Sequence, residues 1–214
     1  MQQSAKTPFL LPYRPILLLA CAIAWTVLVQ HDPFFWDTVQ LGSKHAHHFY
    51  ENALRWTVLP TGIDSGHPPV FGYYIAAVWT LFGKTLPVGH WAMLPFLAGI
   101  ALLLYRLGHR FGGPKYALLL VPIAFLDPVL AGQSALVGPD IPLAFFFLLA
   151  VEAFWGGNRW WAAVGVFGLC AISMRGMMTA GALFVWQALL QVSADRRQRS
   201  QLLRLSVQTP ALLI

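Results

Sequence analysis

The chain has 214 residues, of which 57% are hydrophobic and only 10% are charged, and its mean hydropathy is +0.61. Soluble domains carry about 25% charged residues, and disordered chains combine low hydrophobicity with high charge, so the composition argues against both. The formal net charge of +6 does not indicate nucleic-acid binding, because membrane proteins accumulate Lys and Arg in their cytoplasmic loops. These proportions predict an all-α, polytopic membrane protein.

A helix needs about 20 apolar residues to cross the hydrocarbon core of a bilayer. A cytoplasmic tail, 1–9, precedes the first predicted span, which is an uncleaved helix because its apolar run continues past Cys21 to Trp25. The later spans are predicted within 89–192, and the segment 195–204 is predicted as a basic cytoplasmic loop. The expected spans are 10–30, 89–108, 116–132, 141–154, 160–173, 178–192 and the start of a truncated one at 205–214.

The segment 31–88 is predicted to be a long external loop, and long loops usually carry function. Within it, 38–56 is expected to form an interfacial helix whose polar residues lie largely on one side. Those polar residues are Lys44, His45, His48 and Glu51. A second interfacial helix is expected at 69–82, which has about 14 residues and is short for a span.

The positive charges distinguish the topologies. With a cytoplasmic N-terminus and 69–82 outside the membrane, ten Lys and Arg residues lie inside and four lie outside. The four on the outside are Lys44, Arg55, Lys84 and Arg175. If 69–82 spans and the N-terminus is cytoplasmic, the count reverses to four inside and ten outside. If 69–82 spans and the N-terminus is external, the count is again ten to four, but Lys6 and Arg14 must be exported ahead of the first helix. The positive-inside rule favours the first topology.

Most of the carboxylates fall on the predicted external side. Asp127 lies near the outer end of its helix, and the residues in or beside external loops are Asp32, Asp37, Glu51, Asp64 and Asp140. The positive-inside rule concerns Lys and Arg and does not predict this bias. It points to an active site at the external face.

Several short motifs occur in a fixed order along the chain. An aromatic-flanked Asp37 follows the first helix, and His67-Pro68-Pro69, Leu81-Phe82-Gly83, Gly138-Pro139-Asp140 and Arg175-Gly176 come after it. In this the chain resembles the first module of GT-C glycosyltransferases. It is most similar to the dolichyl-phosphate-mannose protein mannosyltransferases and to the aminoarabinose transferases that modify lipid A. Those relatives are longer, so we expect this chain to be the N-terminal part of such an enzyme.

The resemblance implies transfer of a sugar from a polyprenyl-phosphate donor to a lipid, glycan or protein acceptor outside a bacterial inner membrane. Asp37 would hold the catalytic position, where a carboxylate activates the acceptor, and Asp140 the second acidic position. Either residue also fits a helix cap, because each stands where a predicted helix begins. Asp32 is an alternative to Asp37, although Asp-Pro is also an ordinary turn signal.

The departing lipid phosphate needs positive charge. Arg175 is the first candidate, since an arginine at membrane depth is costly and usually functional, although it also fits an interfacial anchor. His67 is a second candidate, and relatives carry Lys at or near this position. We also place His48 and Glu51 among the substrate-binding residues.

The cluster of His45, His47, His48 and Glu51 also fits a divalent metal ion, but no ligand set is assigned, because a hydrated surface explains it more simply. Two other classes stay open. One is a transporter or channel subunit, which would place ionisable groups at the midplane and repeat its helices. The other is a non-catalytic membrane scaffold.

Overall fold

The computed structural model describes residues 14–36 and 38–208, and all regular secondary structure in this part of the chain is helical, without a strand. The all-α prediction is therefore confirmed for the described residues. The elements in chain order are α1 (Arg14–Val29), the π-helical η1 (Thr38–Ser43), α2 (Lys44–Glu51), α3 (Val70–Phe82), α4 (Leu86–Trp91), α5 (Leu94–Gly112), α6 (Pro114–Phe125), α7 (Pro128–Ser134), α8 (Asp140–Gly156), α9 (Arg159–Ile172) and α10 (Met174–Gln208).

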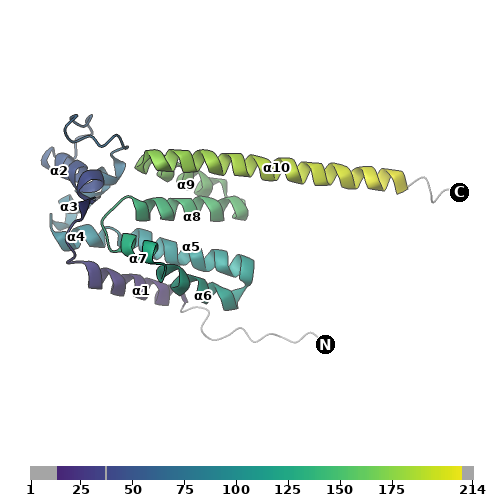
Figure 1. Ribbon diagram of the computed structural model, residues 1–214, viewed down its shortest axis with the longest axis horizontal. Helices are drawn as coiled ribbons and strands as arrows, with labels where there is room; N and C mark the ends of the chain where they lie inside the picture. The colour runs from purple at the N-terminus through teal and green to yellow at the C-terminus, as the bar shows by residue number, and fades with distance from the viewer. Residues whose placement is uncertain (1–13, 37, 209–214) are drawn as a thin grey trace.

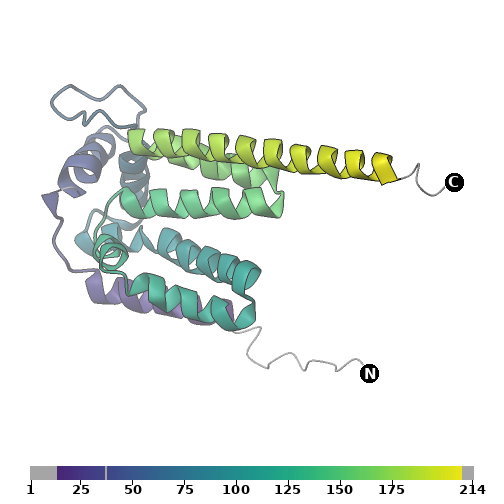
Figure 2. The same cartoon turned by 45° about the vertical axis from the view of Figure 1, so that its right-hand side comes forward.

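The long helices α1, α5, α6, α8, α9 and α10 lie side by side as a bundle, and α2, α3 and α4 gather at one end of it (Figures 1 and 2). We call this end, which also holds α7, the loop end. The other end, where α1 begins and α5 and α8 finish, is called the opposite end. The described chain therefore places the segment between α1 and α5 entirely at one end of the bundle.

Two glycines in the left-handed region reverse the chain at the opposite end. Gly113 has a φ of +78° between α5 and α6, and Gly157 has a φ of +70° between α8 and α9. A residue without a Cβ adopts this conformation at little cost. After Gly157, the side chain of Asn158 accepts a hydrogen bond from the Trp161 N–H at 3.2 Å and caps α9. These tight turns make α5–α6 and α8–α9 antiparallel hairpins.

Close contact between helices depends on small residues. A Cβ on Gly165 of α9 would lie 2.7 Å from the backbone nitrogen of Ala150 in α8. A Cβ on Gly176 of α10 would overlap the carbonyl of Leu169 in α9. Such small residues let helix backbones approach closely, as in many membrane bundles. The α8–α9–α10 layer is held together in this way.

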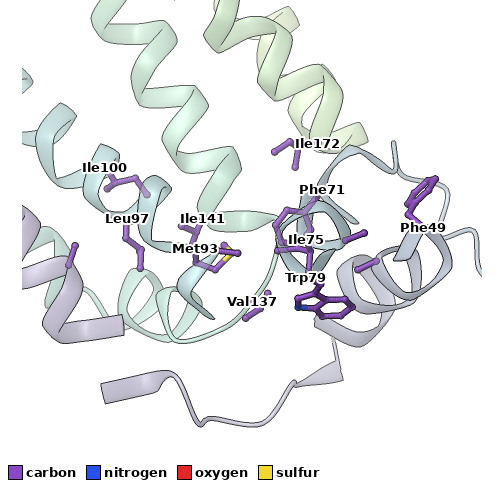
Figure 3. Close-up of a cluster of buried hydrophobic side chains, with 14 of the residues drawn as sticks. Phe49, Phe71, Ile75, Trp79, Met93, Leu97, Ile100, Val137, Ile141 and Ile172 are labelled. Atoms are coloured by element: carbon purple, nitrogen blue, oxygen red, sulfur yellow. The ribbon is translucent and has the colours of Figure 1, made fainter. Parts of the chain in front are cut away.

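The main core joins the loop-end helices to the bundle. Met93 lies beside Ile141 of α8, and Phe71, Ile75 and Trp79 of α3 lie together in the same core (Figure 3). The labelled side chains of this core are Phe49, Phe71, Ile75, Trp79, Met93, Leu97, Ile100, Val137, Ile141 and Ile172. Helices α2 and α3 are thus packed onto the bundle, and the segment 31–88 is not a loose loop.

Large apolar side chains remain exposed on the flanks of the bundle. Examples are Leu28 at 74%, Phe167 at 74% and Met178 at 77% exposure. Two described helical stretches, Leu86–Gly112 and Met174–Ser193, are long and apolar enough to cross a membrane, and Ile16–Val29, Val70–Phe82 and Arg159–Ile172 are shorter apolar helices. Contiguous apolar surface of this kind is unusual on soluble monomers, so these features support membrane association.

Three predicted segments differ from the structure. The span expected at 116–132 is divided into α6 and α7, because Asp127 accepts hydrogen bonds from the N–H groups of Val129 and Leu130 at 3.0 Å and starts a new helix before Pro128. The helix expected at 38–56 ends at Glu51, and Ala53 and Leu54 then adopt positive φ angles of 52° and 57°.

The third difference concerns the basic segment 195–204, expected as a loop before a new span. It lies inside α10, which runs without interruption from Met174 to Gln208. The segment is rich in Arg, Gln and Leu, which favour helices, and it contains neither Gly nor Pro. The remainder of the expected last span, 209–214, lies outside the described residues.

Candidate functional site

An ion pair joins the first turns of two helices at the loop end. The Arg175 Nη2 of α10 lies 3.0 Å from the Asp140 Oδ1 of α8. The side chain of Asp140 is 28% exposed and that of Arg175 is 59% exposed. The structure therefore brings together two of the site residues predicted from the sequence, 35 positions apart in the chain, with the guanidinium group still open to solvent.

The turn between α9 and α10 sets the position of Arg175. Ser173 is extended, with a φ of −159°, and its hydroxyl accepts a hydrogen bond from the Gly176 N–H at 3.3 Å. Gly176 is in close contact with the carbonyl of Leu169. The arginine is thus held at the start of a helix, where the helix dipole disfavours a cation, and the carboxylate of Asp140 offsets that cost.

His67 contacts Met174, the residue before Arg175. Its Nδ1 is 3.5 Å from the backbone N–H of Met174, which is a long hydrogen bond. The loop before α3 turns just ahead of His67, where the Asp64 carboxylate accepts a hydrogen bond from the Gly66 N–H at 2.8 Å and Gly66 has a φ of +72°. We call His67, Arg175 and Asp140 the loop-end triad.

A cavity of about 570 Å³ opens beside His67 and Met174. Its walls include the indole of Trp56, the hydroxyl of Thr57 and the carboxylate of Asp64. The Trp56 ring stacks on Phe49, with a centroid distance of 5.7 Å and an interplanar angle of 13°, yet the residue is 61% exposed. A cavity of this volume with an aromatic wall and a few polar groups is typical of a small-molecule site.

The other two residues predicted to bind substrate lie in different surroundings. The His48 Nε2 is 3.2 Å from the Thr57 Oγ1, so His48 reaches the cavity only through that threonine. Glu51 does not join the triad, because its carboxylate pairs with the Lys84 Nζ at 3.6 Å. The Lys84 Nζ also lies 5.2 Å from the ring centroid of Tyr50. Glu51 and Lys84 stabilise the packing of α2 against the end of α3.

The predicted position of His45 on the wet face of its helix is wrong. The residue is fully buried, together with Ala46 and Phe49. Its Nε2 lies 3.2 Å from the Ser65 Oγ, and its Nδ1 has no hydrogen-bond partner in the structure. Burial lowers the pKa of His45, and the neighbouring carboxylate of Asp64 acts in the opposite direction. The spacing of His45 to Phe49, both on the face that meets α3, was the available signal.

The remaining predicted acidic residues have structural roles where the chain is described. Asp37, the predicted catalytic residue, lies outside the described residues. Asp32, its alternative, receives a hydrogen bond from the His90 Nε2 at 2.9 Å on its backbone carbonyl. Asp127 caps α7, as described above.

Within residues 14–36 and 38–208, no three His, Cys, Asp or Glu side chains lie close enough to hold a metal ion. The four residues considered for a divalent ion are instead turned to different partners. His47 contacts the Ser43 carbonyl at 2.7 Å, and its cluster neighbours contact Ser65, Thr57 and Lys84, as described above. The described residues therefore offer no preformed ligand set in this cluster.

No protein-family model, no curated protein and no solved structure gives a significant match to this chain. The function is therefore argued from the loop-end triad and the cavity beside it.

Proposed function

We propose that the chain is a multi-pass membrane glycosyltransferase, or part of one, which moves a sugar from a polyprenyl-phosphate donor to an acceptor at its loop end. The proposal rests on one observation: the ion pair of Asp140 and Arg175 lies next to Met174, which lines a cavity of about 570 Å³ together with His67. A reaction with a phosphate leaving group needs a cation, a carboxylate and a walled space close together.

Arg175 supplies the positive charge in this proposal. The Arg175 Nη2 pairs with Asp140, and the arginine side chain is 59% exposed. The remaining N–H donors of the guanidinium group suit a phosphate oxygen. As the bond between the anomeric carbon and the phosphate oxygen breaks, these donors would stabilise the negative charge left on the lipid phosphate.

The cavity supplies the space for the sugar. The exposed face of Trp56 offers an apolar surface to a sugar ring, and the carboxylate of Asp64 can accept hydrogen bonds from hydroxyl groups. The acceptor hydroxyl needs a base, a role assigned to Asp37 by resemblance. Asp140 then orients Arg175 and the phosphate without itself attacking the sugar.

The arrangement supports a transferase better than a transporter or channel subunit. A transporter site is expected near the midplane, between broken helices. The ion pair of Asp140 and Arg175 instead joins residues in the first turns of α8 and α10, at the loop end (Figures 1 and 2).

Sugar transfer by the full chain in lipid nanodiscs, from a radiolabelled polyprenyl-phosphate sugar, tests the proposal. Asp140→Asn and Arg175→Gln should each lower the rate of transfer about 100-fold, because each removes charge from the reacting group. Asp37→Asn should abolish transfer. The ion pair is partly exposed, so its loss should change stability by no more than about 1 kcal/mol.

Asp127→Asn is the matched control for Asp140→Asn. Asp127 is also an aspartate at the start of a loop-end helix, and Asn caps helices as well as Asp does. The control should retain transfer. Equal rates in Asp127→Asn, Asp140→Asn and the unaltered chain would refute a role for the loop-end triad in transfer.

A further inference from the structure

A second charged cluster lies at the opposite end of the bundle, far from the loop-end triad. The Arg106 Nη2 of α5 is 2.8 Å from the Glu152 Oε1 of α8, and the Arg110 Nη2 is 3.5 Å from the same oxygen. Arg106 and Arg110 are four residues apart and so lie on one face of α5. One carboxylate oxygen therefore holds two guanidinium groups side by side.

Glu152 is buried, with 6% of its surface exposed. A carboxylate taken out of water needs strong partners, and the two arginines provide them. The arginine side chains themselves are 56% and 37% exposed. The cluster carries two positive charges and one negative charge, so it has an uncompensated positive charge that faces solvent.

The exposed side of the cluster borders a cavity of about 490 Å³. It is lined by Tyr105, Arg106, His109, Arg110 and Glu152. Each arginine uses an Nη2 donor on Glu152, so other N–H donors of both forks remain for a ligand. The fork geometry of arginine matches the oxygens of a phosphate, and a carboxylate that fixes the fork in advance reduces the entropy lost on binding.

Aromatic side chains surround this end of the bundle. Trp160 is 83% exposed, Phe111 is 62% exposed and Trp161 is 54% exposed. Trp155 is in edge-to-face contact with Phe111, with ring centroids 4.5 Å apart. Exposed Trp residues at the end of an apolar helix bundle are typical of the headgroup level of a membrane.

We infer that the cavity formed by Arg106, Arg110 and Glu152 binds the phosphate of an anionic phospholipid headgroup. The cation pair recognises the phosphate, and the aromatic side chains place the cavity at the depth where headgroups lie. The inference depends on the membrane embedding proposed above and is independent of sugar transfer.

Native mass spectrometry of the full chain, purified from mixed phosphatidylglycerol and phosphatidylcholine, tests the inference. The unaltered chain should retain phosphatidylglycerol in preference to phosphatidylcholine. Arg106→Gln should weaken retention about tenfold, because hydrogen bonds from a charged group are lost. Arg106→Lys keeps the charge but loses the fork, so it should also weaken retention.

Arg159→Gln and Arg159→Lys are the matched controls, because Arg159 lies at the same end of the bundle but lines a different cavity. They should leave retention unchanged. Equal effects at Arg106 and Arg159, or no effect of Arg106→Lys, would indicate diffuse electrostatic attraction and would overturn the proposal of a specific site. Displacement of the lipid by millimolar inorganic phosphate would assign the cavity to free phosphate and overturn the assignment to a lipid.

Arg106→Gln leaves Glu152 with one partner and could prevent folding. The double substitution Arg106→Gln and Glu152→Gln removes that stranded charge. It should fold and should still lose the preference for phosphatidylglycerol, and retention of the preference would overturn the inference. None of these measurements uses transfer activity, so failure here and failure of the proposed reaction can be told apart.

Discussion

At the scale of single residues, histidines of one helix have opposite environments. His48 reaches a threonine at the surface, whereas His45 is fully buried with one unpartnered nitrogen. A buried imidazole with one unpartnered nitrogen favours its neutral form, since protonation would place a charge in the core. His45 therefore links the packing of α2 to pH.

The direction of this pH dependence follows from the lowered pKa of His45. Its ordinary value is 6.5, and burial moves the pKa in the folded chain below that. Below about pH 6.5 the unfolded state binds more protons, so the folded state loses stability as the pH falls, by at most about 1.4 kcal/mol per pH unit. Above that range the contribution of His45 is complete and constant.

We expect the thermal midpoint of the full chain in detergent to decrease when the pH is lowered from 7.5 to 5.5. The decrease should be smaller in His45→Gln. Intrinsic tryptophan fluorescence provides the measurement. The chain has seven histidines, so the difference between the two profiles is the informative quantity. Identical profiles would show that His45 does not titrate on unfolding.

At the scale of elements, α2 and α3 are in close contact at the loop end. A Cβ on Gly72 of α3 would overlap the Cβ of His45 and lie 3.0 Å from the nitrogen of Ala46. The site depends on this contact, because the segment that carries Trp56, Asp64 and His67 connects the end of α2 to the start of α3. The two atoms contacted, the Cβ of His45 and the backbone nitrogen of Ala46, cannot move away by a change of side-chain rotamer.

Gly72→Ala should therefore destabilise the folded chain by about 1–3 kcal/mol through overpacking. Gly181→Ala is the control, since Gly181 lies in α10 with nothing within 4 Å of the added Cβ. That change should be neutral or slightly stabilising, because Ala favours helix over Gly. The thermal midpoints of the two variants, measured side by side, decide the matter, and equal midpoints would contradict the close contact.

The sequence predicted the existence of the helices better than their ends. The predicted span at 141–154 corresponds to α8, and the segment at 160–173 to α9. Apolar runs predict such helices because burial in an apolar medium favours them. From the sequence, Asp127 followed by Pro128 fits either a carboxylate within a span or a kink or helix end. The side-chain cap of Asp127 decides for the helix end.

At the scale of the whole molecule, the described helices place the positive residues on two sides. Arg106, Arg110 and Arg159 lie at the opposite end, and Arg175 and Lys84 lie at the loop end (Figures 1 and 2). Helix α3 packs on α2 and contacts α9 at the loop end. This arrangement favours the proposed topology in which α3 does not span.

Labelling of single cysteines tests that topology. In a chain with Cys21 and Cys170 replaced by Ala, Gly62→Cys should react with an impermeant maleimide on intact cells. Arg159→Cys should react only after permeabilisation, because it lies at the other end. If α3 spans, both positions fall on the same side whichever way the N-terminus points, so identical accessibility would exclude the proposed arrangement.

The sequence alone determined the all-α class and the approximate position of the apolar helices, which follow from composition and apolar patterning. Asp140, Arg175 and His67 became candidate site residues through short motifs that resemble those of a known family, and such motifs are also local properties. Only the tertiary structure decided that Asp140 pairs with Arg175 while His67 contacts Met174, that Glu51 belongs to a separate pair, and that Glu152 gathers two arginines. Such contacts join helices far apart in the chain, and close packing at positions such as Gly72 and Gly176 sets their distances, which no local pattern encodes.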